Sequence, residues 1–466
     1  MLRTNPLASE LFPERTARRR VGWALVRGSS GLSGATSRWL ERFEVLAVRA
    51  FGADTLLYGV SAVIAGLNLV VASGGDYRAW AIVATPLYAI AALASLLLDR
   101  IGDVEQATRW RHRLVLILLV GVVVVPLGDA VAARALALPG IHAQAEVVVI
   151  ERCGDRVLHG HDCYLTHPTT AGSSVSSASH ALDANAFVPY LPGMALFGLP
   201  NGLPLPTVLR DARVWMSTFT VAVLAFGAWL ARLAPAQRWR LLLLVVVLPA
   251  GALPMVTGGD DLPVIALLAT GLLLVETKPR TAGIALGLAT AFKLTAWPIV
   301  ALLLLVRDPT VNRRRLIPPI VAIGGGLNLL GAAINLRAFI TNDIRFPLGL
   351  TSVRSPAQSP LLGQALVQLA PSEHRLIVVG LVAIGLAGTA LLIRAAWPLT
   401  VDRAILVAAL VLLLATVLAP QTRFGYLLYP FDLLAVLVLR RTTRVPIDSD
   451  QINPDLRQTA LARLER

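Results

Sequence analysis

The sequence contains little charge and very little lysine. Only 15% of its 466 residues are charged, while 56% are hydrophobic and the mean hydropathy is +0.68. A soluble domain would carry about 25% charged residues, so long apolar runs must account for the difference. This balance excludes a soluble globular protein and indicates a multi-span membrane protein. Two lysines, Lys278 and Lys293, stand among 42 basic residues, which makes a lysine within an apolar run conspicuous.

Several signals of other protein classes are absent. The first fifty residues are polar and rich in arginine, without the short apolar core and cleavage site of a signal peptide. No Walker or GxGxxG pattern stands in a suitable context for nucleotide binding. The net charge of +14 does not indicate a nucleic-acid partner, because the arginines lie at the ends of apolar runs, where they orient membrane helices.

Runs of about 20 apolar residues predict the membrane spans. They lie near 54–73, 79–98, 114–137, 212–232, 239–257, 261–276, 281–306, 316–340, 376–397, 404–420 and 424–440. Basic residues favour the cytoplasmic side, which places the N-terminal tail, 99–113, 232–240 and the turn with Lys278 and Arg280 inside. Alternation along the chain then places 139–211 outside.

The segment 281–306 does not fit this alternation, because basic clusters flank it on both sides. A re-entrant hairpin that enters and leaves on the cytoplasmic side restores the charge rule. The interior sequence TAFKLTAWP supplies a break, since Pro298 lacks an amide donor and disfavours helix at Trp297. This interpretation gives ten full crossings, one hairpin and two cytoplasmic termini; an ordinary span at this place is the alternative.

The domain organisation follows from these spans. We expect a cytoplasmic Arg-rich tail at 1–53, a transmembrane hairpin at 54–113, a membrane domain at 114–441 and a cytoplasmic tail at 442–466. Two long outer segments, 139–211 and 341–375, interrupt the membrane domain, and connections of such length usually carry function or disorder.

Carboxylates on the predicted outer side are the first candidates for chemistry. They are Asp129, Glu146, Glu151, Asp260 and Asp261. Ionisable groups at membrane depth are costly and by default suggest function. The structural alternative is a solvated interfacial charge or, for Asp260 and Asp261 before a Leu-Pro helix start, an N-cap. That alternative is weaker for Glu146, because Val147, Val149 and Ile150 press the same segment against apolar surface.

Cations near the membrane are the second group. Lys293 lies inside the apolar hairpin, Arg423 lies at an outer turn, and Arg345 and Arg354 lie in the second outer segment. Such cations can bind a lipid-linked phosphate, a carboxylate or backbone carbonyls, and snorkelling to headgroups is the structural alternative.

The first outer segment also holds five of the seven histidines and both cysteines of the chain. The spacing of His142, His159, His161, His167 and His180 matches no closed zinc site, and we expect no metal centre, with a divalent ion as the alternative. Cys153 and Cys163 lie outside the membrane, so we expect a disulfide that pins the segment, with free thiols as the alternative.

Several of these motifs together resemble a known family. Glu146, Val147, Val149 and Ile150, followed by Leu158, Gly160 and Tyr164, are similar to the acidic motif and the later Gly–Tyr motif of glycosyltransferase family 87, in the GT-C superfamily. PYLPGMALFGLP, TGGDDLPVIALL, AGIALGLATAFKLTAWP and RFGYLLYP follow in the order of that family. The resemblance spans roughly 114–441, departs from the family in having Glu rather than Asp at 146 and Cys at 163, and leaves 54–98 as an additional N-terminal hairpin.

The resemblance implies an all-α GT-C bundle in the plasma membrane whose long first outer loop carries the catalytic carboxylate. The implied activity is inverting transfer of a sugar from a polyprenyl-phosphate donor to a glycolipid or glycan of the cell envelope. The resemblance implies mannose as the sugar, with arabinose or another pentose as the alternative. Glu146 is the implied base and Asp129 the second candidate, while Arg423, Lys293, Arg345 and Arg354 are the candidates for the donor phosphate. Lys293 reaches that phosphate only from a deep outer cavity. Side chains proposed to contact substrate are Tyr164, Tyr190, Asp260, Asp261 and Tyr426.

Two other classes remain open at this point. A secondary transporter would explain the many spans, the broken helix and the buried charges, although the two halves show no matching interrupted segments. A catalytically inactive membrane scaffold is the other alternative. A cavity at Glu146 that opens to outer water and to lipid would favour the enzyme.

Overall fold

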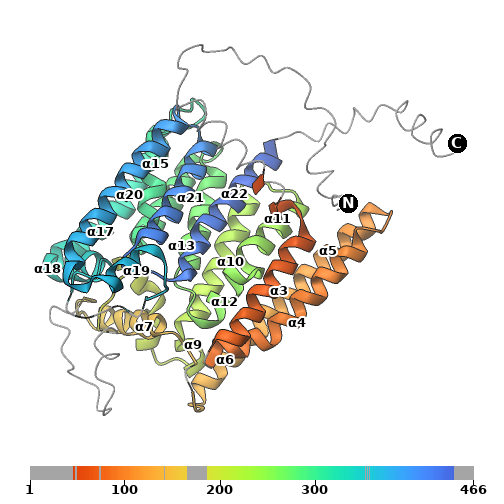
Figure 1. The fold of residues 1–466 in the computed structure, drawn as a ribbon, viewed down its shortest axis with the longest axis horizontal. Helices are drawn as coiled ribbons and strands as arrows, with labels where there is room; N and C mark the ends of the chain where they lie inside the picture. Colours follow the sequence, from red (N-terminus) through yellow and green to blue (C-terminus); the bar gives the residue numbers. More distant parts are fainter. Residues whose placement is uncertain are drawn as a thin grey trace.

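The computed structural model describes residues 46–47, 50–72, 75–140, 142–164, 186–351, 353, 355 and 357–444. Most of the two predicted tails, His167, His180 and Arg354 lie outside the described residues. Within these ranges the chain is helical and has no β-strand, apart from one isolated bridge between Gln358 and Thr422. Long helices stand side by side, and α7, α9, α18 and α19 gather at one end of the bundle (Figure 1), here called the α7 end. The predicted all-α architecture is confirmed.

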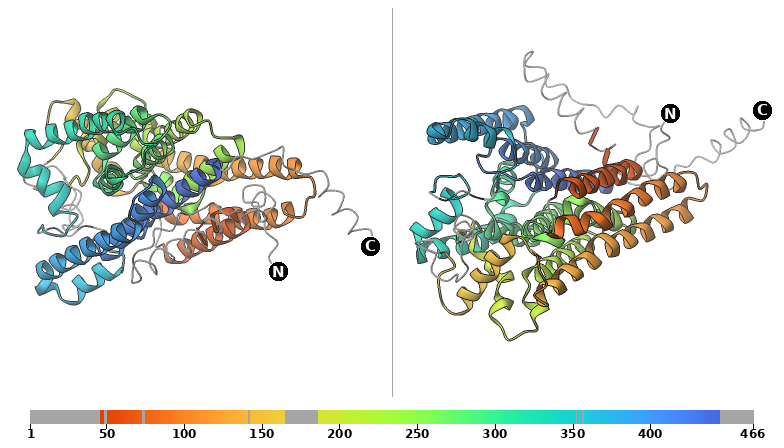
Figure 2. Two further views of the ribbon diagram at one scale, coloured as in Figure 1. Left: turned by 90° about the horizontal axis from the view of Figure 1, so that it is seen from above. Right: turned by 60° about the horizontal axis from the view of Figure 1, so that its bottom comes forward.

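Three long helical segments form one edge of the molecule (Figure 2). They are α3 (Asp54–Val71), α4 (Gly75–Leu98) and the continuous run of α5 (Val104–Leu118), the π-helical η1 (Leu119–Val124) and α6 (Val125–Ala135). The third segment begins at Val104, ten residues before the predicted span. The Asp103 side chain accepts from the Glu105 and Gln106 amides and caps the helix, so a polar first turn precedes the apolar run.

The first long segment contains helices of its own. They are α7 (Ala145–Leu158), η2 (Pro192–Phe197), η3 (Leu199–Gly202) and α9 (Thr207–Arg210), and α10 (Ala212–Leu230) follows. Next come α11 (Pro235–Leu242), the π-helical η4 (Leu243–Val247) and α12 (Pro249–Thr257), with a bend of 52° between η4 and α12. Pro249 at the start of α12 lacks the amide that would continue the helix. The chain then enters α13 (Leu262–Leu274), which is buried between α10 and α14.

Residues 281–306 form two helices with a break at Lys293. These are α14 (Pro279–Phe292) and, after η5 (Leu294–Ala296), α15 (Trp297–Leu305). The break lies within the predicted sequence TAFKLTAWP, at Lys293, which is extended (φ −152°). Pro298 lies in the first turn of α15, where its missing N–H costs no hydrogen bond, so the predicted cause of the break is wrong.

The neighbours of α14 show that the chain turns back at this break. A Cβ on Gly283 would lie 2.3 Å from the Leu316 carbonyl oxygen, and a Cβ on Gly324 would lie 2.1 Å from Thr290 Oγ1. The contacts advance together along both helices, so α14 runs parallel to α16 (Arg313–Pro319) and η6 (Ile320–Gly325). Parallel neighbours require a return in between, which α15 provides. After α15, at the end of the bundle where α14 begins, the Arg307 amide donates to the Leu399 carbonyl.

The remaining helices complete the bundle. They are α17 (Gly326–Ile334), α18 (Leu336–Ile340), η7 (Thr341–Arg345), α19 (Leu362–Leu369), η8 (Pro371–Glu373), α20 (His374–Ala396), α21 (Val401–Leu418), η9 (Phe424–Leu427) and α22 (Leu428–Arg444). Among the described residues, seven helices are long and apolar enough to cross a membrane, or up to eight if the bent pair is one span. The chain is therefore a multi-pass membrane protein, and the count of ten crossings stays a prediction.

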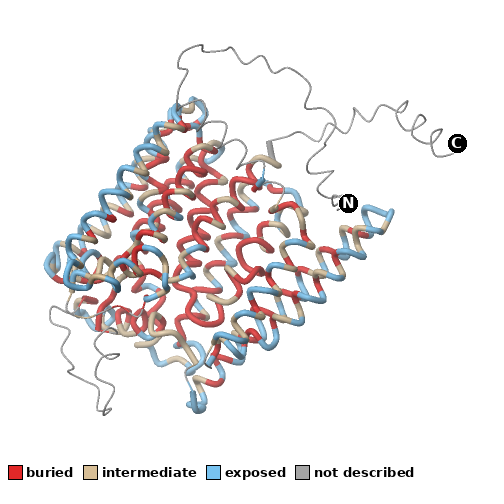
Figure 3. Tube along the Cα trace, viewed as in Figure 1, coloured by how far each residue is buried: buried red, intermediate tan, exposed pale blue. Residues whose placement is uncertain are grey.

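Burial follows the position of the helices in the bundle. The central helices α13, α21 and α22 are largely buried, whereas α20 and the α3–α5 edge expose much of their length (Figure 3). The exposed side chains of these outer helices are apolar, for example Val70 at 83% and Leu376 at 70% exposure. Such faces are expected to contact lipid.

Candidate active site

Helix α7 carries Glu146 in its first turn at the α7 end of the bundle. Its buried residues Val147, Ile150 and Gly154 recur at helical spacing and face η2 and η3. Contact is close where Gly154 meets Gly198: a Cβ on Gly154 would lie 2.0 Å from the Gly198 carbonyl carbon. The apolar residues of EVVVI therefore form the buried face of an amphipathic surface helix.

A disulfide closes the far end of this helix. Cys153 in α7 is bonded to Cys163, with 4.6 Å between their Cα atoms. The next residue, Tyr164, is buried, and its hydroxyl donates to the Tyr190 carbonyl oxygen at 2.8 Å. The staple therefore connects α7 to the returning part of the loop, which carries Tyr190.

Glu146 is paired with a cation. Its carboxylate forms an ion pair with the guanidinium of Arg423, which lies in the turn between α21 and α22. The two side chains are 18% and 28% exposed, so the pair is partly accessible. Backbone hydrogen bonds fix this turn, because the Thr422 amide donates to Ala357 and the Ser359 amide donates to Thr422.

Lys293 lies in a second, buried ionic cluster. Its Nζ is 2.6 Å from Asp260 Oδ2 and 2.5 Å from Asp261 Oδ1. The Tyr429 hydroxyl donates to Asp261 at 2.6 Å, and Lys293 itself is 7% exposed. Two carboxylates thus compensate one ammonium, and this cluster fastens the apex of the α14–α15 hairpin to the turn before α13. The structure brings Lys293 and the two aspartates together, as ionic partners of one another.

Tyr190 lies between the two ionic groups. Its ring centroid is 5.3 Å from Lys293 Nζ, while the Tyr426 ring is 5.8 Å from the same atom. Burial raises the pKa of the Tyr190 hydroxyl well above its ordinary value, and the nearby carboxylates of Asp260 and Glu146 raise it further. Tyr190 therefore stays neutral and connects Lys293 with the Glu146–Arg423 pair.

Other predicted site residues lie elsewhere. Asp129 is exposed on α6, and Arg345 is exposed at the end of η7. Within the part of the chain that the structure describes, no three His, Cys, Asp or Glu side chains come together as metal ligands would.

An ionic network that the sequence did not predict joins α7 to α6 and to the start of α10. Arg134 of α6 donates to both Glu151 oxygens at 2.6 and 2.7 Å and to Asp211 at 2.9 Å. Asp211 also accepts from Arg213, which donates to the Val256 carbonyl at 2.7 Å. The available signal was weak: Arg134 stands in the last turn of α6 and Glu151 lies in the outer segment, where an exposed charge is the usual interpretation.

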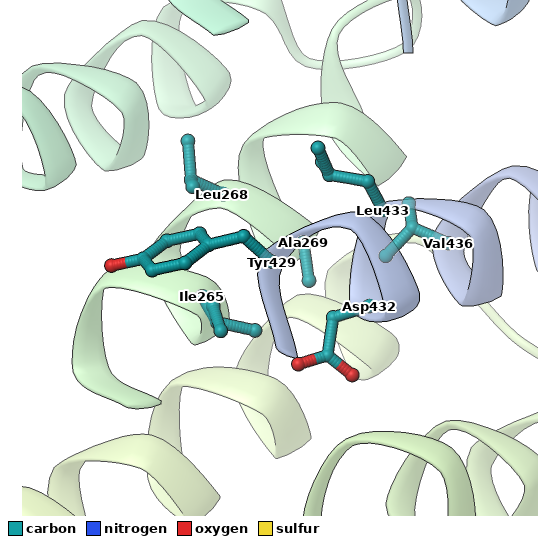
Figure 4. Close-up of a pocket in the computed structure, with 7 residues that line it drawn as sticks. All are labelled: Ile265, Leu268, Ala269, Tyr429, Asp432, Leu433 and Val436. Atoms are coloured by element: carbon teal, nitrogen blue, oxygen red, sulfur yellow. The ribbon is translucent and has the colours of Figure 1, made fainter. Parts of the chain in front are cut away.

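A small cavity lies deeper in the bundle, between α13 and α22 (Figure 4). It measures about 10 Å³ and is lined by Ile265, Leu268, Ala269, Tyr429, Asp432, Leu433 and Val436. This volume holds at most about one water molecule, so it does not accommodate a sugar. Neither Glu146 nor Arg423 lines it.

The fold and these ionic clusters define an integral membrane protein with a polar, aromatic site at one end of its bundle. The chain belongs to glycosyltransferase family 87, whose model matches residues 187–420, half of its length. No curated protein and no solved structure gives a significant match. The chain is therefore a membrane glycosyltransferase with a GT-C type helical fold. The matched region contains Tyr190, Asp260, Asp261 and Lys293, whereas Glu146 and Arg423 lie outside it.

Proposed function

We propose that this glycosyltransferase moves a sugar, mannose by family resemblance, from a polyprenyl-phosphate donor to a hydroxyl of a glycolipid or glycan. The observation that carries the proposal is the partly accessible Glu146–Arg423 pair at the α7 end. It combines a carboxylate that can accept a proton with a cation that can bind a phosphate, at the end of a membrane bundle where a lipid-linked donor would present its headgroup.

In this mechanism the acceptor oxygen attacks the anomeric carbon while Glu146 takes its proton. The bond between the anomeric carbon and the phosphate oxygen breaks, and its electron pair stays with the departing polyprenyl phosphate. Arg423 stabilises the charge that develops there. A single displacement of this kind inverts the anomeric centre.

The ion pair also suggests an order of events. While Arg423 holds Glu146 in the ion pair, the guanidinium occupies the carboxylate oxygen that would otherwise accept from the acceptor hydroxyl. A donor phosphate competes for the guanidinium and releases Glu146 to the acceptor. Lys293, with two aspartates around it, holds the hairpin apex in this proposal and leaves the phosphate to Arg423.

The proposed setting follows the charge distribution of the chain. Both termini are cytoplasmic, the α7 end is extracytoplasmic and the membrane is the plasma membrane. The donor's lipid tail then lies in the bilayer, and the acceptor belongs to the cell envelope.

The test is transfer from a labelled polyprenyl-phosphate mannose in membranes that contain the protein. We expect Glu146→Gln to lower the rate at least about a hundredfold, because the amide cannot take a proton. Asp129→Asn is the matched control and should retain the wild-type rate. Full activity in Glu146→Gln would contradict the proposed base, and a loss confined to Asp129→Asn would move that role to Asp129.

A further inference from the structure

We propose that the α3–α4 hairpin forms part of the substrate site and that Tyr77, in the first turn of α4, binds the acceptor sugar. The hairpin lies outside the region that the family model matches. The inference rests on the proposed function for the identity of the acceptor. The contacts of Tyr77 are the observations that support this inference.

Tyr77 is connected directly to the segment that leads into Glu146. Its hydroxyl accepts a hydrogen bond from the Gln144 side-chain amide. Gln144 is the N-cap residue of α7, and its side chain also donates to Thr257 Oγ1 at 3.1 Å. The Gln144 backbone amide donates to the Thr257 carbonyl at 2.8 Å. Tyr77 therefore lies where the start of α7 meets the turn that carries Asp260 and Asp261.

Tyr77 lies near the Glu146–Arg423 ion pair. Glu146 and Arg423 lie near enough for their charges to act on the Tyr77 hydroxyl. Tyr77 is half-buried, whereas Tyr190 and Tyr429 are only 4% and 2% exposed. Part of the Tyr77 ring is thus accessible beside the proposed base, where the acceptor hydroxyl must arrive.

The chemistry of a phenol suits a sugar ring. Its aromatic face packs against the C–H face of a pyranose, and its hydroxyl can donate to a sugar hydroxyl. In the bond with Gln144 the Tyr77 oxygen is the acceptor, and the hydroxyl also lies beside the Thr257 side chain, whose place as hydrogen-bond partner a sugar hydroxyl can take. A donor phosphate is drawn to Arg423, and Tyr77 is therefore assigned to the uncharged acceptor.

The hairpin is held rigidly enough to serve as one wall of a site. Asp76, next to Tyr77, is buried and lies 3.5 Å from both Arg213 Nη1 and His142 Nδ1. Deeper in α4, the Trp80 indole donates to the Val122 carbonyl at 2.8 Å, and the Tyr88 hydroxyl donates to the Val247 carbonyl. Tyr77 is thus positioned before a substrate arrives, which lowers the entropic cost of binding.

The experiment uses the full chain in lipid nanodiscs with octyl α-mannoside as acceptor probe. Its dissociation constant and its KM are compared with the KM of a polyprenyl-phosphate mannose donor. We expect Tyr77→Phe to weaken probe binding and raise the acceptor KM about three- to tenfold, the effect of one lost hydrogen bond. Tyr77→Ala should weaken both further, while the donor KM stays unchanged.

Tyr58→Phe on α3 removes the same hydroxyl at the opposite end of the hairpin and should behave as wild type. Unchanged probe binding in both Tyr77 variants, or no binding by wild type, would overturn the proposal. Wild-type binding without transfer would instead overturn the proposed function, and Tyr77 would then be judged by the binding data alone. An equal rise in donor and acceptor KM would show a general structural role and would also overturn the proposal.

Discussion

At the scale of single residues, Lys293 holds the apex of the α14–α15 hairpin in place through its ion pairs. Its ammonium is buried between Asp260 and Asp261, with the Tyr429 hydroxyl on the second carboxylate. Removing one partner of a buried ion pair is far more costly than removing all of them, because the remaining charges lose their compensation. The cluster is therefore expected to be important for stability whatever its part in catalysis.

We predict that Lys293→Met destabilises the protein by about 3–5 kcal/mol, because two buried carboxylates are left unpaired. Thermal unfolding in detergent measures this change. The triple variant Lys293→Met, Asp260→Asn, Asp261→Asn removes every charge of the cluster and should recover much of the loss. Wild-type stability in Lys293→Met combined with a raised donor KM would instead make Lys293 a phosphate ligand.

The sequence singled out Lys293 but not its role. A lysine inside an apolar run is conspicuous where lysine is so rare, and Asp260 and Asp261 were visible beside a helix start. Their pairing depends on how two distant segments fold together, and local pattern carries no information on that. The same holds for Glu146 and Arg423, which were predicted separately as base and phosphate ligand and which the structure joins in one ion pair.

At the scale of elements, the contact between α14 and the α16–η6 run depends on small residues. Gly283, Gly287 and Gly324 lie where a Cβ would meet the backbone or a threonine hydroxyl of the neighbouring helix. Their absence of side chains lets two parallel helices approach closely. The GxxxG pattern formed by Gly283 and Gly287 therefore serves close packing, and its partner is the α16–η6 run.

We predict that Gly283→Ala destabilises the protein by about 1–3 kcal/mol, because the new methyl group would lie 2.3 Å from the Leu316 carbonyl oxygen. Gly326→Ala is the matched control, since no atom lies within 4 Å of its added Cβ. Alanine favours helix there, and stability should stay equal or rise slightly. Equal melting temperatures for the two variants would contradict the close contact.

Most helices were predictable from the sequence, and the exceptions have physical reasons. Long apolar runs predict α3, α4, α10 and α21, because side chains of this kind are stable in the membrane and not in water. The start of α5 at Val104 was missed, since its first turns are polar and are stabilised by a cap and the Glu105–Arg109 pair. Helix α7 was treated as part of a loop because its apolar face is short and interrupted by charges.

At the scale of the whole molecule, the turn at Lys293 determines which chain segments share a side of the membrane. Because α14 runs parallel to α16, the segment 306–312 lies at the same end of the bundle as the turn before α14. If α14 and α15 were counted as one crossing, every later segment would be assigned to the opposite side of the membrane. In the orientation proposed from the charge rule, 306–312 and the N-terminal side of α5 are cytoplasmic and η8 is outside.

We predict that single cysteines report this orientation. Gln106→Cys and Thr310→Cys should react with a membrane-impermeant maleimide only after the cells are permeabilised, while Ser372→Cys should react in intact cells. All three positions are exposed, and the native cysteines are bonded to each other and do not interfere. Labelling of Thr310→Cys in intact cells would contradict the proposed orientation.

The disulfide between Cys153 and Cys163 has a consequence for how the protein is made. Thiols oxidise stably in exported compartments and stay reduced in the cytosol. With the first long segment on the proposed outer side, the bond can form only after that segment has been translocated, so the closure of the loop behind α7 follows membrane insertion. Production in a host whose exterior lacks thiol oxidation should then yield inserted chains with an open loop.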